Sequence, residues 1–158
     1  MGKRESAKTT GMSEITGKTV KIRHATEADM AFIEEQLRKN NIDTGSLDHG
    51  EFVVAREDGD IVGFGRLRKI SGFYQLGCVV VVEDRRHRGI GSLIVKHLMD
   101  FSSVNLVYVV TDVVDYFRGL GFVEMKEGSK ELLDALDEAC RLKGKPNTVL
   151  MVYEKPAA

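Results

Sequence analysis

The sequence has few cysteines, no long apolar run and almost no net charge, and each shortage excludes a class of protein. Its 158 residues include only two cysteines, Cys78 and Cys140, and no CxxC pair or Cys/His cluster indicates a metal site. We expect both thiols to be reduced, as in a reducing cytosol. No apolar run approaches the roughly 20 residues of a membrane helix, and the N-terminus lacks an apolar signal-peptide core. We therefore expect a soluble, cytoplasmic protein with no metal and no membrane partner.

Positive and negative charges are balanced, because 23 Lys and Arg face 24 Asp and Glu for a formal net charge of −1. Such a chain has no broad basic field for nucleic acid, so we expect no nucleic-acid partner. The length and a hydrophobic content of 42% suit one domain with a buried core. Residues 1–17 are polar and lack periodicity, so we predict a flexible leader before a single domain over residues 18–158. The sequence leaves open whether Met12 is the natural start.

Hydrophobic periodicity predicts the element order β-α-β-β-β-α-β-α-β-α-β. The Asp58-Gly59 dipeptide between two β-rich runs is a strong hairpin signal. An antiparallel meander then leads into a βαβ-like half, which predicts a mixed α/β sheet. The expected strands cover 20–23, 52–56, 61–70, 73–82, 106–110, 122–125 and 148–153, and the expected helices cover 27–39, 90–101, 113–120 and 131–142.

The segment from Val79 to Ser92 combines three features that favour a bound pyrophosphate. Two glycines, Gly89 and Gly91, let the backbone approach a ligand closely. The helix that begins there offers unpaired N–H groups and the positive end of its dipole. Three arginines add positive charge, although a glycine-bearing turn with a solvated basic face is the alternative. Neither the G-x-G-x-x-G fingerprint nor the Lys-Ser/Thr ending of a phosphate loop is present.

The pattern Arg86-x-x-Gly89-x-Gly91, after a β-rich strand and before a Leu/Ile helix, resembles a family signature. It is similar to the Arg/Gln-x-x-Gly-x-Gly/Ala motif of the GNAT superfamily of acyl-CoA N-acyltransferases. The downstream segment Tyr116–Phe122 resembles that family's Phe-Tyr-x-x-Leu-Gly-Phe segment. The spacing between the two segments and the upstream hairpin also agree, so the resemblance covers about residues 19–125.

The resemblance implies a GNAT-like fold, in which a mostly antiparallel sheet flanked by helices contains one splayed parallel pair. The candidates for this pair are the strand ending at Val82 and the strand over 106–110. Acetyl-CoA is the implied cosubstrate, with its pantetheine arm along the first strand and its pyrophosphate at the glycine-bearing turn. The implied cofactor-binding residues are Val79, Val80, Val81, Arg86, His87, Arg88, Gly89, Ile90, Gly91, Ser92 and Phe117.

The resemblance also identifies where the usual catalytic groups are missing. In these enzymes a neutral amine attacks the thioester, and an acid protonates the leaving thiolate. The family's tyrosine acid falls at Phe117, which has no proton to donate, so Tyr116 is the candidate acid. The alternatives are a packed aromatic at 116 and protonation of the thiolate by water. The family's glutamate base falls at Gln75, which can orient a water but cannot accept a proton at neutral pH.

These residues predict an N-acetyltransferase that moves the acetyl group of acetyl-CoA onto a primary amine in a ternary complex. The acceptor is expected to be a small molecule or an amino acid, and Arg66 and Arg68 could hold its carboxylate if their shared strand face lines the cleft. A solvated strand face is the alternative. Two other functions stay open: an acetyl-CoA-binding sensor or partner subunit without turnover, and a protein Lys or N-terminal acetyltransferase. The resemblance also allows a homodimer.

Overall fold

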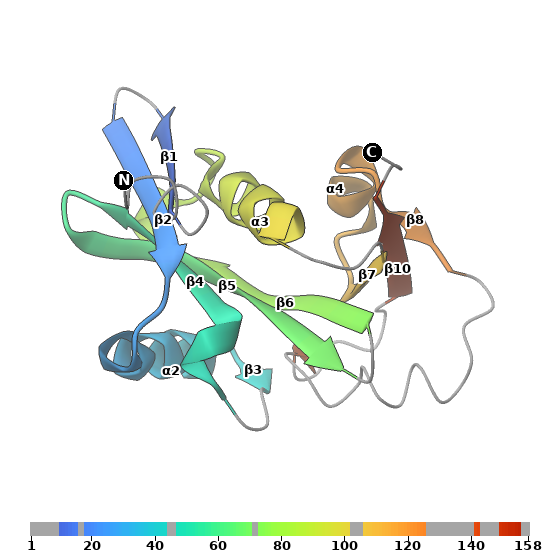
Figure 1. The fold of residues 1–158 in the computed structure, drawn as a ribbon, viewed down its shortest axis with the longest axis horizontal. Helices are drawn as coiled ribbons and strands as arrows, with labels where there is room; N and C mark the ends of the chain where they lie inside the picture. Colours follow the sequence, from blue (N-terminus) through green and yellow to red (C-terminus); the bar gives the residue numbers. More distant parts are fainter. Residues whose placement is uncertain are drawn as a thin grey trace, which may run out of the picture.

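The computed structural model describes residues 10–15, 18–43, 47–70, 73–101, 106–125, 141–142 and 149–155. An eight-stranded sheet has the order β1-β2-β4-β5-β6-β7-β10-β8 (Figure 1). Its ladders are antiparallel except for β6 with β7, so the predicted mixed sheet is confirmed. Its strands are β1 (Thr10–Ile15), β2 (Lys18–His24), β4 (Phe52–Glu57), β5 (Asp60–Ile70), β6 (Phe73–Val81), β7 (Leu106–Thr111), β8 (Val123–Glu124) and β10 (Val149–Glu154).

Helices lie on both faces of the sheet, with α2 on one face and α3 and α4 on the other (Figure 1). The α-helices are α2 (Met30–Lys39), α3 (Ile90–Phe101) and α4 (Val114–Gly119). Three short 3-10 turns are also described. The first, η1 (Glu27–Asp29), precedes α2; the second, η2 (His49–Glu51), precedes β4; and the third, η3 (Glu83–Arg85), precedes the loop that leads into α3. None of the described helices has the length and apolar character needed to cross a membrane.

The sheet separates two apolar cores. The larger, here called the α3 core, gathers side chains such as Ile94, Leu98 and Val109 between the sheet and α3. The smaller, here called the α2 core, packs Ile33 and Leu37 of α2 against the other sheet face. Because strand side chains alternate between faces, β4 supplies Val53 and Ala55 to the first core, and Phe52 and Val54 to the second.

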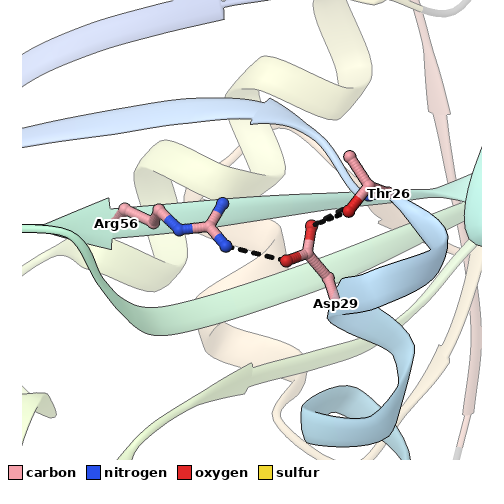
Figure 2. Close-up of polar contacts among 3 residues, drawn as sticks. All are labelled: Thr26, Asp29 and Arg56. Carbon is pink, nitrogen blue, oxygen red and sulfur yellow. Dashed lines mark hydrogen bonds and ion pairs between the residues drawn. The ribbon is translucent and has the colours of Figure 1, made fainter.

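The start of α2 is tied to the sheet by one carboxylate (Figure 2). Asp29 accepts hydrogen bonds from the Thr26 backbone N–H at 2.8 Å and from the Thr26 hydroxyl at 3.1 Å. Arg56 of β4 donates to the other Asp29 oxygen at 2.7 Å. Burial alone would raise the Asp29 pKa, but these hydrogen bonds and the Arg56 charge outweigh burial and lower it. The carboxylate therefore stays charged at neutral pH and fixes α2 beside β4.

Two stretches differ from their sequence-based expectations. Thr10–Ile15, within the expected flexible leader, forms β1 and pairs with β2. Hydrogen bonds between the backbones of β1 and β2 stabilise this strand. Because such bonds require no particular side chains, the sequence shows no hydrophobic pattern that would predict the strand. Arg141–Leu142, the expected end of a helix, form β9, which pairs with β3 (Ile42–Asp43) in a separate ribbon. The rest of that expected helix, residues 131–140, lies outside the described residues.

The expectation of a reduced thiol at Cys78 is wrong, because Cys78 is disulfide-bonded. The other cysteine of the chain, Cys140, lies outside the described residues. Composition and local pattern carry no information on which cysteines approach each other in space, since that depends on the tertiary fold.

Candidate functional site

A β-bulge in β6 shapes the site. Phe64 of β5 pairs with Val80 and Arg66 pairs with Gly77, so two residues of β6 oppose one residue of β5. One of the two is Cys78, whose φ is 50°. A bulge bends its strand and interrupts the alternation of side chains. Accordingly Leu76 packs in the α3 core, whereas Cys78 and Val80 pack in the α2 core.

The parallel strands β6 and β7 separate just beyond this point. Their described pairing joins Tyr74–Leu76 to Val107–Val109 and goes no further. The splayed pair expected from the sequence is therefore present between these two strands. Its closed end lies at Leu76 and Val109, and it opens toward the C-terminal ends of both strands.

A cavity of about 530 Å³ occupies this opening and extends to the first turn of α3. Of the expected cofactor residues, Val80 and Arg88 do not line it, since Val80 packs in the α2 core and Arg88 is exposed. The others line it: Val79, Val81, Arg86, His87, Gly89, Ile90, Gly91, Ser92 and Phe117. Arg85, one of the three arginines of the basic turn, and Val109 and Val110 of the expected splayed strand also line it. Sequence reasoning missed the wall formed by Leu76, Gly77 and residues 111–113. For Thr111 and Asp112, the sequence contained one signal, since these two residues directly continue an apolar strand that was expected to border the opening.

The turn before α3 has the geometry of an anion site. His87 and Gly89 have φ values of 66° and 85°, which turn the backbone sharply into the helix. A Cβ placed on Gly89 would meet no atom within 4 Å, so the glycine faces open space. The first turn of α3, beginning at Ile90, presents N–H groups that have no acceptor within the helix. This turn therefore aims backbone donors and a positive helix end into the cavity.

Two arginines of the turn are fixed by hydrogen bonds. Arg86 donates to the Val81 carbonyl at 2.8 Å and to the Asn40 side chain at 3.0 Å, which joins the turn to the end of α2. Arg85 donates to Glu57 at 2.8 Å. This hydrogen bond, and then the charge of the neighbouring Asp84, raise the pKa of the Arg85 guanidinium. Both arginines line the cavity with their positions already set.

Tyr116 and Phe117 occupy different environments although they are adjacent. The Tyr116 hydroxyl is 2.9 Å from the Ser92 hydroxyl, and it would lie 4.0 Å from a Cβ placed on Gly91. The Tyr116 hydroxyl therefore lies at the N-terminus of α3. Phe117 is buried, lines the cavity and packs edge-to-face on Phe122 with 5.2 Å between ring centroids. The position where the family signature has tyrosine thus presents an apolar ring.

On the opposite face of the sheet, Arg66 is buried and its guanidinium contacts an acidic and an aromatic side chain. It is 2% exposed and reaches Glu51 at 2.6 Å, and its guanidinium lies 5.5 Å from the centroid of the Phe52 ring. Its neighbour along the same face, Arg68, is half-buried. The two arginines share a strand face, as expected, but neither of them lines the cavity between β6 and β7. Within the described part of the chain, no group of three or more His, Cys, Asp or Glu side chains could hold a metal ion.

Comparison with known proteins agrees with this geometry. Residues 48–124, which contain β4 to β8 and the whole splayed pair, match the family model described as an acetyltransferase (GNAT) domain. The curated proteins contain no match to the sequence. N-acetylglutamate synthase from Neisseria gonorrhoeae, solved with coenzyme A and N-acetyl-glutamate, is similar in structure with a TM-score of 0.70 and 17% identity. The alignment covers 87% of this chain but only 35% of the synthase chain, so this chain spans about a third of that protein.

Two further structures are similar over nearly their whole length. Rv2747 from Mycobacterium tuberculosis, in complex with CoA and NLQ, has a TM-score of 0.67 and 21% identity, covering 85% of this chain and 99% of its own. The diaminobutyrate acetyltransferase EctA from Paenibacillus lautus, with L-2,4-diaminobutyric acid and coenzyme A, has a TM-score of 0.60 and 20% identity, covering 87% and 96%. At such low identities these likenesses show a shared fold.

Proposed function

We propose, from the premise that this chain carries the acetyltransferase domain of the GNAT family, that it transfers an acetyl group from acetyl-CoA to a primary amine. The observation that supports this most directly is the cavity between β6 and β7, which runs from the closed end of the splay to the N-terminus of α3. The end at the closed part of the splay suits the reacting thioester, and the end at the N-terminus of α3 suits the pyrophosphate. When bound, acetyl-CoA supplies the activated acetyl group that the amine attacks.

The residues around the cavity fit such a cofactor. Backbone N–H groups from Gly89 to Ser92 would hold the pyrophosphate, because the positive φ of Gly89 leaves their approach unobstructed. Arg86 would add positive charge without needing to reorder, since its guanidinium is already held by two hydrogen bonds. Val79 and Val81, turned toward the cavity by the bulge, would line the path of the pantetheine arm.

The same geometry guides the proposal for the proton transfers. Phe117 cannot donate a proton, and the hydroxyl of Tyr116 lies beside Ser92 at the phosphate end of the cavity. We therefore assign Tyr116 to cofactor binding and protonation of the thiolate to water, while its role as the acid stays a competing prediction. Gln75 is buried one residue from the closed end, where its amide can orient a water or the incoming amine.

The acceptor is proposed to be a small amine of the amino-acid type. N-acetylglutamate synthase and EctA, both solved with coenzyme A, hold N-acetyl-glutamate and L-2,4-diaminobutyric acid. This chain shares their fold, and its cavity extends to Ile42 on the α2 side of the sheet. Direct attack by the amine on the thioester requires both substrates to be bound together, as in a ternary complex.

The first experiment measures release of free CoA thiol from acetyl-CoA with a panel of amino acids, polyamines, aminoglycosides and short peptides. We expect release above background with amino acids. No release with any amine, in a protein that binds acetyl-CoA, would favour a sensor or partner subunit. Release with peptides alone would favour a protein acetyltransferase.

A matched pair of glycine variants tests where the cofactor binds. Gly89→Glu should abolish measurable acetyl-CoA binding, because the added carboxylate fills the turn and repels phosphate. Gly59 in the β4–β5 hairpin also has a positive φ, 86°, and open space around its Cβ position. Gly59→Glu therefore introduces the same charge and the same backbone strain away from the cavity, and it should bind acetyl-CoA like the wild type. Equal binding by both variants, measured by calorimetry, would refute the proposed site.

A further inference from the structure

Helix α3 leads from the phosphate end of the cavity toward the closed end of the splay. A Cβ placed on Gly63 of β5 would meet Ile90 and Ile94, whereas a Cβ placed on Gly65 would meet Ile94 and Leu98. The helix therefore runs along β5 in the direction of the chain. Because β5 and β6 are antiparallel, this direction leads back along β6 from its end toward its start.

Val95 marks how far the cavity reaches along this helix. Gly91 and Val95 are four residues apart, so they share one face of α3, about 6 Å apart along its axis. Both line the cavity, and a Cβ placed on Gly91 would lie 3.7 Å from Val81 of β6, so this face looks toward β6. Of the described residues of α3, Val95 is the last one that lines the cavity.

Buried side chains from four elements form this end of the cavity. Leu76 of β6 and Val109 of β7 are the last paired residues of the splayed strands. Val95 of α3 and Phe117 of α4 belong with them to the α3 core, so all four lie on the same side of the sheet. All four line the cavity, and none is more than 6% exposed. We call Leu76, Val95, Val109 and Phe117 the deep end of the cavity.

The polar side chains along the cavity lie away from the deep end. Thr111 and Asp112 follow Val109 toward the open end of the splay, where a strand advances about 3.3 Å per residue. Tyr116 contacts Ser92 at the N-terminus of α3. The charged and titratable residues of the preceding turn that line the cavity are Arg85, Arg86 and His87. The deep end is thus apolar, and the ring of Phe117 stands where the family signature has a phenol.

We propose that the deep end receives the acyl group of the thioester, and that Val95 sets the length of the acyl group that binds. The donor class is then a short, uncharged acyl-CoA, for which acetyl is the best fit. A longer chain would collide with close-packed side chains, because the paired part of β6 and β7 blocks its way. A carboxylate at the end of the acyl group would be buried against apolar side chains. This inference rests on the proposed acetyltransferase function and narrows its donor class.

Binding of acyl-CoA thioesters tests this donor class without requiring turnover or a known acceptor. Calorimetry compares acetyl-, propionyl-, butyryl- and succinyl-CoA. For the wild type, we expect the Kd values of butyryl-CoA and succinyl-CoA to exceed that of acetyl-CoA about tenfold or more, since one methylene in an apolar pocket already has an effect of this size. With an amine that supports thiol release, the ratios of kcat/KM for the same donors give a second readout.

Two variants of Val95 change the deep end in opposite directions. Val95→Ala removes two methyl groups, so the Kd of butyryl-CoA should fall to within about threefold of that of acetyl-CoA. Val95→Ile adds one methylene and should raise the Kd of propionyl-CoA relative to acetyl-CoA about tenfold. Val107→Ala is the matched control, because Val107 is also 0% exposed in the α3 core but does not line the cavity. It should leave both ratios within about twofold of the wild type.

The possible outcomes separate this inference from the proposed function. A wild type that binds butyryl-CoA or succinyl-CoA as tightly as acetyl-CoA would overturn the inference, and so would Val95 variants with unchanged ratios. Equal changes in Val107→Ala would also overturn it, because they would come from a general loosening of the α3 core. In these cases thiol release from acetyl-CoA with an amine would leave the acetyltransferase function standing. If none of the thioesters binds, the proposed function fails together with the inference.

Discussion

Single residues at positions 116 and 117 decide how this site differs from the family signature. The motif places a phenol on the residue that here is Phe117, and the structure confirms that this residue lines the cavity. The sequence could therefore show that the usual acid is missing. It could not show where the neighbouring phenol goes, because the partner of Tyr116 is Ser92, 24 residues away on another helix. A contact of that kind depends on how α3 and α4 pack.

Tyr116→Phe separates the two roles of this tyrosine. If its hydroxyl binds cofactor phosphate, its loss removes about 1 kcal/mol, so the Kd for acetyl-CoA should rise roughly fivefold. The kcat at saturating acetyl-CoA should then stay within about twofold of the wild type. Calorimetry with acetyl-CoA and steady-state kinetics provide both numbers. An unchanged Kd with a kcat lowered at least about a hundredfold would instead identify Tyr116 as the acid.

At the scale of elements, helix α3 packs very closely against β5, the strand next to the splayed pair. A Cβ placed on Gly65 would lie 2.7 Å from Ile94 Cγ2 and 3.0 Å from Leu98 Cδ1 of α3. This helix and the β4–β5–β6 meander could be predicted from sequence, because each has a strong period of its own. The short strands β1 and β9 could not, since β1 is polar and is held by backbone pairing with the adjacent β2, and β9 is a strand only through pairing with the distant β3.

Gly65→Ala should push α3 away from β5 and lower the free energy of unfolding by about 1–3 kcal/mol. Gly119 in α4 is the matched control. A Cβ there would meet no atom within 4 Å, so Gly119→Ala should leave stability unchanged or raise it by up to about 1 kcal/mol. Urea unfolding of both variants measures the difference. A Gly65→Ala protein as stable as the wild type would show that α3 can shift without loss.

At the scale of the whole molecule, the stability of the sheet and its two cores depends on the protonation of a partly buried histidine. His97 of α3 is half-buried, and burial, followed by the charge of His24 on β2, lowers its pKa below the usual value near 6.5, although Asp100 acts in the opposite direction. The folded protein thus binds this proton less readily than the unfolded chain. Stability that depends on neutral His97 is fully present above the unfolded pKa and is lost as the pH falls below it.

The free energy of unfolding should therefore decrease from pH 7 to pH 5, and His97→Gln should flatten this decrease. His24→Gln should flatten it in part, because removing that charge lets the His97 pKa rise. Chemical denaturation at a series of pH values gives both slopes. The prediction fails if His97→Gln retains the full wild-type slope between pH 7 and pH 5.

The bulge in β6 also determines which genetic changes this strand can accept. Because two residues of β6 oppose Gly65, the side chains before and after the bulge follow opposite parity. The insertion or deletion of one residue between Leu76 and Val80 would move each later side chain of β6 to the opposite face of the sheet. The valines that now line the cavity would turn into the α2 core, and core residues would turn into the cavity. A substitution in this strand therefore leaves the assignment of side chains to the two faces unchanged, whereas a change in its length reverses that assignment.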